Sequence, residues 1–431
     1  MQFVTICRNL RLMRRLIGVP FLFVSLYPLS ALPAPLTLEQ AWNQAELANP
    51  ALRATQANLA AAQGELTDAR APLWNNPQLA TEWRKRSIPQ TADPAQINRE
   101  WTVGLAQTFE IAGQQGKRRS AAEQSLGATQ EVIAETRRQL RAEVEQRFVQ
   151  VLSLQLRIQM EERTLKLIEE AATAVRKRVA AGEDSRLDGN LAKVEAERAQ
   201  NQVSVLREQL VQARTELVTL LQLPTDNLSE AGGYLDPSSA SYTLNELLDS
   251  AANRPLLRAF DYREKAARSR LDMERAAVYP DVTLGLSTAR EGSADSRDII
   301  AGLNVSLPLP LFRRNGTGIG RATTELTQVQ VQQQAVQRDA RAQVLALWQR
   351  WENLKTRVKR LSESVLPSLE ENQHLSSVSF RAGEIGLLQL LLVNRQVLDG
   401  QRDLLDARTE LRLTQVALEA AAGWQPARDM H

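Results

Sequence analysis

Apolar residues recur every seven positions over long parts of the chain. One series begins with Val144 and Val151, and another, near the C-terminus, begins with Leu390 and Val397. This spacing keeps apolar side chains on one side of an α-helix and favours left-handed supercoiling, so it predicts long coiled helices. The stretch from about 117 to 181 would form a helix roughly 100 Å long at 1.5 Å per residue.

Four shorter segments alternate between apolar and small or polar residues with a period of two. They lie at residues 78–84, 101–109, 282–288 and 299–307. This alternation is typical of transmembrane β-strands, which need about 9–11 residues, but also of two hairpins that pack on a soluble core. In the first case the lipid-facing residues would be Trp101, Val103, Leu105, Val282, Leu284, Leu286, Leu303 and Val305.

The same order of segments occurs twice, about 200 residues apart, which indicates a tandem repeat. In each half a helical segment precedes two strands and then a long helical hairpin with one glycine break. The expected parts are a first repeat at 35–224 (strands about 77–110, hairpin about 115–222), a linker at 225–241, a second repeat at 242–424 (strands about 280–310, hairpin about 318–422) and a C-terminal tail at 425–431.

Residues 1–34 have the composition of a secretory signal peptide. They contain four arginines and no acidic residue, and an apolar run from Leu16 to Leu29 precedes the small residues Ser30 and Ala31. The order of basic, apolar and small residues predicts cleavage during export. Without the four arginines of this leader, the formal net charge changes from +3 to −1, and the single cysteine also lies in the leader. A general nucleic-acid role therefore loses its main support.

Strands that span a membrane would require an oligomer. Four strands cannot close a barrel, and lipid does not tolerate an open sheet edge. Single-chain barrels begin at about eight strands, so at least two copies are needed, and three copies would supply twelve strands. Long coiled helices attached to such a shared barrel would form a tube.

This plan resembles the TolC family of outer-membrane efflux channels. The segment QTFEIAGQQGKR at 107–118 and the segment LPLPLFRRNG at 307–316 are similar to segments of the cobalt–zinc–cadmium resistance subgroup. The resemblance covers nearly all of residues 36–424 and implies a mainly α fold with a small transmembrane β part. It implies a homotrimer in which four strands per chain form one twelve-stranded β-barrel above an α-barrel of coiled hairpins.

The resemblance also implies a periplasmic adaptor and a proton-driven inner-membrane pump as partners. In this family the hairpin tips face the adaptor, with glycine followed by serine or threonine three residues on and an acid six residues on. The first tip matches with Gly182, Ser185 and Asp188, whereas the second has glycine, glycine and glutamine. The expected adaptor-facing residues are Gly182, Glu183, Asp184, Ser185, Asp188, Gly383, Glu384, Gly386 and Gln389.

The tip residues also have a simpler interpretation. A glycine is the usual residue just after a helix end, whatever the tip contacts, and acids in an exposed turn are ordinarily solvated. If the tips form the mouth of a channel, Glu183, Asp184 and Glu384 would favour entry of cations. Gln389 argues against an acidic ring at the second tip.

Motifs for catalysis are missing from the sequence. It has no nucleophile elbow, phosphate loop or zinc-protease motif. One cysteine and two histidines do not make a Cys/His metal cage within one chain. We therefore expect no enzyme, no cofactor and no metal site. Carboxylates of the long helices, such as Glu161 and Glu162, are expected to lie on solvated faces.

The function predicted from these observations is a passive outer-membrane channel of a tripartite efflux system, with its helical part in the periplasm. Heavy-metal cations are the first substrate class, because of the subgroup resemblance. One alternative is a drug or protein export duct of the same family. Another is a periplasmic coiled-coil scaffold or adaptor without a pore. The expected contacts are other copies of the chain, the adaptor, the pump and outer-membrane lipid.

Overall fold

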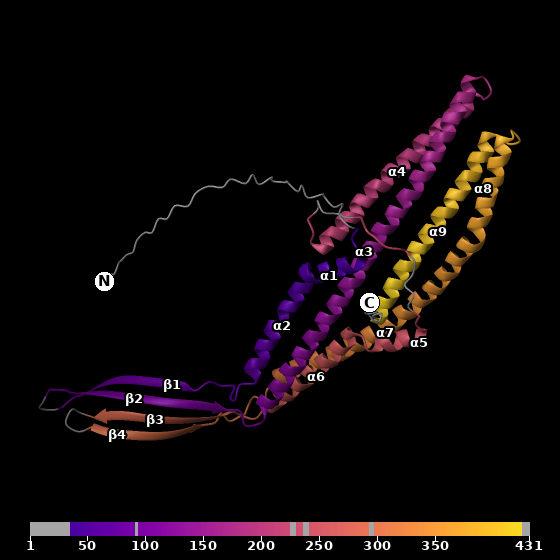
Figure 1. Ribbon diagram of the computed structural model, residues 1–431. Coiled ribbons are helices and arrows are strands. Elements are labelled where there is room, and N and C mark those ends of the chain that lie inside the picture. The colour runs from indigo at the N-terminus through magenta and orange to yellow at the C-terminus, as the bar shows by residue number, and fades with distance from the viewer. Residues whose placement is uncertain (1–34, 91–93, 225–229, 236–240, 293–296, 425–431) are drawn as a thin grey trace, which may run out of the picture.

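The protein is elongated, with a β-sheet at one end and paired helices that extend away from it (Figure 1). The computed structural model describes residues 35–90, 94–224, 230–235, 241–292 and 297–424. The predicted signal peptide, parts of the predicted linker and the C-terminal tail lie outside the described residues.

The elements follow the same order in both halves of the chain. The first half contains α1(Leu38–Ala48), α2(Pro50–Ala69), β1(Gln78–Ile88), β2(Gln96–Phe109), α3(Gln114–Ala180) and α4(Arg186–Leu221). The second half contains α5(Leu244–Ala252), α6(Pro255–Ala276), β3(Val282–Gly292), β4(Arg297–Ser306), α7(Gly316–Arg360), the π-helical turn η2(Leu361–Val365), α8(Leu366–Arg381) and α9(Leu387–Ala422).

The first helix of each half begins with the same N-terminal capping motif. The hydroxyl of Thr37 accepts a hydrogen bond from the backbone of Gln40 at the start of α1, and Thr243 does the same with Glu246 at the start of α5. The Gln40 and Glu246 side chains bond back to the threonine backbone, which completes a capping box at each helix. The second helix of each half, α2 and α6, begins with a proline.

The four strands form one antiparallel sheet in the order β1-β2-β3-β4. The central pair, β2 and β3, joins the two halves through a register that runs from Trp101 opposite Arg290 to Phe109 opposite Val282. β1 is longer than the alternation at 78–84 predicts, because it continues from Lys85 to Ile88 while paired with β2. Backbone pairing with β2 therefore extends the strand beyond its apolar part.

The seven-residue apolar series form the helix cores. Val144 and Val151 of α3 are fully buried against Leu217 and Leu221 of α4. In α9 the four successive positions Val397, Leu404, Leu411 and Leu418 are all buried. Within the described residues, none of the helices combines the length and the apolar character needed to cross a membrane.

The second long hairpin differs from the first in one arm. α3 runs without a break over 67 residues, but the matching arm changes from α7 to α8 through η2. Pro367 lies in the first turn of α8, where its missing N–H cannot bond to the preceding turn. The backbone N–H of Leu366 instead reaches the carbonyl of Leu361, five residues back. The wider turn thus accommodates the proline within a continuous arm.

Ion pairs cross the contact between α3 and α9, which we call the seam. Glu161 is 3% exposed and accepts two hydrogen bonds from Arg402, at 2.6 and 2.8 Å. Nearby, Arg412 donates to the buried carboxylate of Glu145. The expectation that Glu161 is solvated is therefore wrong, because a carboxylate taken out of water needs a charged partner. Its neighbour Glu162 is partly exposed and pairs with Arg207 of α4.

Burial raises the pKa of two carboxyl groups at the seam. The Glu145 carboxyl loses hydration, which outweighs the opposing effect of Arg412, so its pKa lies above the ordinary value. Burial likewise raises the pKa of Glu419, which accepts a hydrogen bond from the Tyr242 hydroxyl at 3.2 Å. The pKa of Glu135 behaves differently: burial would raise it, but hydrogen bonds and charge from Arg138, helped by Gln139, bring it below the ordinary value.

The seam predicts a pH dependence of stability. In the folded state the pKa values of Glu145 and Glu419 lie above the ordinary glutamate pKa of 4.5. Just above pH 4.5, the folded state therefore binds more protons than the unfolded state. The contribution of these groups to stability therefore falls as pH rises from 4.5 through their folded pKa values. Glu145→Gln should flatten this part of the pH profile of the Tm, measured by circular dichroism in detergent. A slope equal to that of a Glu162→Gln control would contradict the assignment.

Candidate functional site

The predicted lipid-facing residues lie on one face of the sheet, which we call the apolar face. In the register, Leu105 pairs with Leu286, and Leu286 pairs with Leu303. On the same face, Trp83 pairs with Trp101, and the next pair towards the helices is Thr81 with Val103. Of the predicted set, Leu105, Leu284, Leu286, Leu303 and Val305 are exposed in the chain, while Trp101, Val103 and Val282 are half-buried.

The opposite face of the sheet, which we call the polar face, carries small and polar side chains. Gly104 pairs with Ser287, and Ser287 pairs with Gly302. The hydroxyl groups of Thr108 and Thr283 form a hydrogen bond of 2.8 Å on this face. Towards the end of the sheet that lies away from the helices, the polar face has the charged residues Glu82, Arg84, Arg86, Glu100, Glu291 and Asp298.

The first hairpin tip joins α3 to α4 at the end of the molecule farthest from the sheet (Figure 1). Gly182 has a φ of 80°, and the N–H of Glu183 bonds to the carbonyl of Arg178. Together with the bond from Gly182 to Val179, this is a Schellman motif, which requires the left-handed conformation that glycine adopts freely. The hydroxyl of Ser185 then caps α4 in a capping box with Asp188.

The second tip, between α8 and α9, ends its first helix in the same way. Gly383 has a φ of 77°, and the N–H of Glu384 bonds to the carbonyl of Ser379. The start of the next helix differs, because Gly386 is at the cap position and supplies no side-chain hydrogen bond. Gln389, which takes the place of the acid, is exposed. The two tips thus share a turn but differ in how α4 and α9 begin.

Arg178 sets the local charge of the first tip. Its guanidinium lies 3.0 Å from a carboxylate oxygen of Asp184 and 3.7 Å from one of Glu183. It also lies 5.8 Å from the centre of the Phe380 ring, so it connects the two tips. Phe380 packs with the buried residues Val175 and Ala192. Sequence reasoning missed Arg178, although basic residues are favoured in the last turn of a helix.

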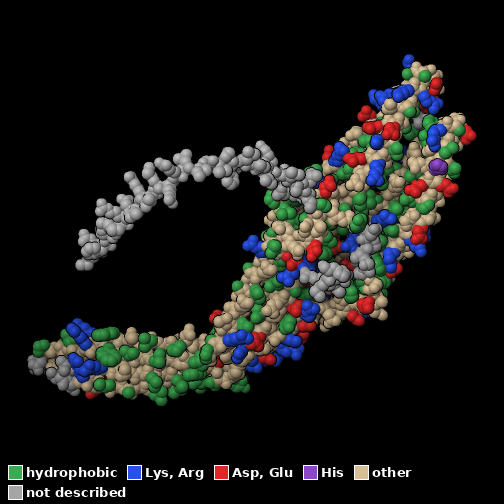
Figure 2. Space-filling view, in the orientation of Figure 1, with side chains coloured by type: hydrophobic (Ala, Val, Ile, Leu, Met, Phe, Trp, Pro, Cys, Tyr) green, Lys and Arg blue, Asp and Glu red, His purple; other side chains and the backbone are tan. Residues whose placement is uncertain are grey.

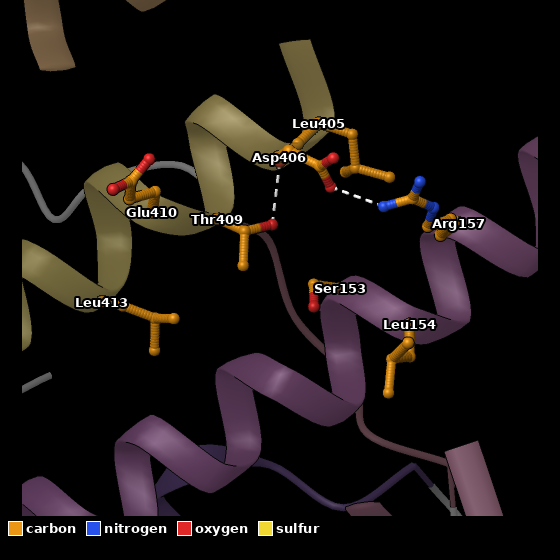
Figure 3. A pocket seen from close by; sticks show the side chains of 8 residues that line it. All are labelled: Ser153, Leu154, Arg157, Leu405, Asp406, Thr409, Glu410 and Leu413. Carbon is orange, nitrogen blue, oxygen red and sulfur yellow. Dashed lines mark hydrogen bonds and ion pairs between the residues drawn. The ribbon is translucent and has the colours of Figure 1, made fainter. Parts of the chain in front are cut away.

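A shallow groove of about 190 Å³ opens along the seam (Figure 3). Arg157 of α3 and Asp406 of α9 point towards each other across it and form an ion pair of 2.7 Å. The remaining wall is formed by side chains such as Leu154, Thr409 and Leu413. The groove therefore offers packing and one ion pair, without a nucleophile poised beside a base. In the described parts of the chain, no group of three or more His, Cys, Asp or Glu residues is placed to hold a metal ion.

Comparison with characterised proteins shows relatives named for metal resistance. The chain is 28% identical over 385 residues to the cobalt-zinc-cadmium resistance protein CzcC of Cupriavidus metallidurans, covering 89% of this chain and 87% of that protein. It is 27% identical over 335 residues to the nickel-cobalt-cadmium resistance protein NccC of Alcaligenes xylosoxydans, covering 76% and 72%. A pyoverdine export outer membrane protein, OpmQ of Pseudomonas putida, is 25% identical and covers 87% and 83%.

Solved structures of outer-membrane channels have the same fold. The protein CusC matches with a TM-score of 0.73 at 19% identity, over 90% of this chain and 92% of that chain. The outer membrane protein VceC of Vibrio cholerae matches with a TM-score of 0.75 at 19% identity, over 90% and 96%. These likenesses confirm the predicted class of fold, a tandem helical repeat with a small sheet.

The family itself follows from the sequence profile of the outer membrane efflux proteins, which matches residues 41–222 and 247–424. These two segments together make up most of the chain and correspond to its two structural halves. The chain therefore belongs to the outer membrane efflux protein family, and it is a non-enzymatic outer-membrane channel protein with a helical periplasmic part.

Proposed function

We propose that three copies of the chain form one channel that exports heavy-metal cations, supplied by a proton-driven inner-membrane pump through a periplasmic adaptor. The observation that carries this proposal is the apolar face of a sheet with two unpaired edges. Between the helices and the tryptophan pair Trp83–Trp101, the apolar face has no charged residue. We infer that this face contacts lipid.

The edges of the sheet support the assembly. β1 and β4 are the outer strands in the described chain, so each leaves a row of backbone groups without a strand partner. In lipid an unsatisfied backbone group costs several kcal/mol, so these edges must pair with other copies. Three copies would close a barrel of about twelve strands, within the range of known outer-membrane barrels.

The charge of the polar face supports a cationic substrate. In the described strands, its four acids, Glu82, Glu100, Glu291 and Asp298, outnumber its two bases, Arg84 and Arg86. In a closed barrel with the apolar face outside, these residues line the lumen. An excess of acids at a pore attracts cations and repels anions. The metal resistance proteins CzcC and NccC among the relatives support the same substrate class.

The hairpin tips are proposed as the docking end. They lie at the opposite end of the molecule from the sheet, which places them deep in the periplasm if the sheet is in the outer membrane (Figure 1). The adaptor-facing set would then include Gly182, Ser185, Gly383 and Gly386 with their acidic neighbours. Arg178 offsets one of the two negative charges of Glu183 and Asp184. The first tip turn therefore keeps one net negative charge, and Glu384 adds another at the second.

Deletion of the gene tests the substrate class. We expect lower tolerance to cobalt, zinc and cadmium salts and higher retained metal after loading, measured by elemental analysis, with recovery on complementation. The relative that exports pyoverdine makes an organic substrate the second candidate. Unchanged metal tolerance together with increased sensitivity to organic compounds would favour that candidate. A chain recovered from the soluble periplasmic fraction would contradict both.

A charge on the apolar face tests the lipid-facing assignment. Leu303→Arg should cost about 2–4 kcal/mol if the residue faces lipid near the middle of the membrane. Asn304→Arg, the adjacent residue on the polar face, is the matched control and should cost much less. The measurement is the yield of heat-sensitive trimers in the outer-membrane fraction and their unfolding in denaturant. Equal losses for both variants would contradict the assignment.

A change at the tip turns tests their role in docking. Gly182→Ala and Gly383→Ala force alanine into the left-handed region, at a cost of about 1–2 kcal/mol each. We expect faster limited proteolysis at the tips and reduced metal export, with a normal amount of trimer. Gly64→Ala is the control, because a methyl group there meets no atom within 4 Å in the middle of α2. If the variants were cleaved faster at the tips but exported metal normally, docking at these turns would be contradicted.

A further inference from the structure

The apolar face changes abruptly to a cationic one at the end of the sheet away from the helices. Trp83 and Trp101 are directly paired, and the next pair on the same face is Lys85 with Arg99. On the other side of Trp101 lies Arg290, and Arg297 pairs with Gly292 one row further out. We call Lys85, Arg99, Arg290 and Arg297 the cationic rim.

The cationic rim has no counter-charge within the described residues. All four side chains are exposed, and none of them is in an ion pair with a described residue. Every acid of the described strands lies on the polar face instead. There the bases are paired, since Arg84 lies 2.8 Å from Glu82 and Arg86 lies 4.0 Å from Glu100.

Basic side chains are concentrated at this end of the sheet on the surface (Figure 2). Figure 2 shows Lys and Arg side chains gathered at the end of the sheet away from the helices, beyond a stretch dominated by hydrophobic side chains. If charge at this end served only solubility, acids and bases would be mixed on both faces, as they are on the helices. Four bases without an acid nearby among the described residues repel one another, and a bound anion would relieve this repulsion.

The position of the cationic rim indicates which anion. The proposed lipid-facing assignment, on which this inference rests, places the tryptophan pair at the membrane interface, where aromatic girdles lie. The Lys85–Arg99 pair lies two residues further along the strands, roughly 7 Å beyond the tryptophans at 3.3 Å per residue. This is the level of the headgroups. The end away from the helices faces the outer leaflet, because the helices extend into the periplasm.

We infer that the cationic rim binds the phosphate groups of phosphorylated lipids in the outer leaflet. Arginine suits this role because its planar guanidinium can donate two hydrogen bonds to one phosphate. Three of the four residues are arginines. In the proposed trimer, three cationic rims surround the barrel, so each chain holds its own lipids at the outside wall, separate from the transport path on the polar face.

The test uses the purified full-length trimer in neutral detergent, with bis-phosphorylated lipid A as the probe. Titration with lipid A should raise the temperature at which the trimer dissociates on gels and should retain several lipid molecules per trimer by native mass spectrometry. The variant Lys85→Gln/Arg99→Gln/Arg290→Gln/Arg297→Gln should lose most of this retention, at least several-fold. Arg84→Gln/Arg86→Gln, with its changes on the polar face, is the matched control and should keep it.

Other outcomes overturn the inference. One such outcome is that the quadruple variant retains as much lipid A as the unmodified trimer. Another is that the unmodified trimer retains dephosphorylated lipid A equally well, and a third is that inorganic phosphate at the same phosphate concentration stabilises it equally. If the quadruple variant does not assemble, the single variants Arg99→Gln and Arg297→Gln should each show partial loss. Failure of the proposed function is distinguishable, because Leu303→Arg would then assemble normally. Poor assembly of Leu303→Arg with unchanged lipid retention in the rim variant would refute the cationic rim alone.

Discussion

The structure depends on one constraint: the backbone groups at both edges of a four-stranded sheet must find hydrogen-bond partners. In water these groups are hydrated, but a hydrocarbon environment offers no alternative to another strand. The four-stranded sheet, the smallest part of the chain, thus requires association with other copies. In the described chain, β2 and β3 join the two halves into one continuous sheet, and the outer edges of β1 and β4 are left open.

The helical part is held by a different balance. The seven-residue apolar positions fill the cores of the helix pairs, yet the seam between α3 and α9 is fastened by buried ion pairs such as Glu161–Arg402. Such pairs add little net stability, because desolvation offsets most of the attraction, but they penalise any shift that separates the partners. Long helices that pack side by side can slide along one another. Charged contacts at fixed heights specify one register.

The class of fold could be predicted from the sequence because its signals are local and repeated. Seven-residue spacing identifies helices such as α3, alternation identifies strands, and Gly182 and Gly383 mark the turns between helices. The seam could not be predicted, since Glu145 and Arg412 are 267 residues apart and nothing in the sequence pairs them. The extension of β1 was missed because it begins with the charged residues Lys85 and Arg86, and their place is set by pairing with β2.

The candidate surfaces were predicted unevenly for the same reason. Alternation assigned Leu105, Leu286 and Leu303 to one face, and the sheet register brings them side by side. Arg178 and the cationic rim were missed, because a lone basic residue in a sequence is indistinguishable from an ordinary solvated one. Its meaning depends on which acids lie nearby, and that requires the three-dimensional arrangement.

The unequal starts of α4 and α9 have a consequence for symmetry. The two halves are alike in outline, so a threefold assembly would present six tips that look nearly equivalent. Ser185 and Asp188 cap one kind of tip, whereas Gly386 leaves the other without a side-chain cap. A partner ring that touches all six would meet two alternating surfaces of different rigidity and charge. The six tips would therefore form two sets of three. A partner surface that fits the tips of one set optimally would not fit those of the other set equally well.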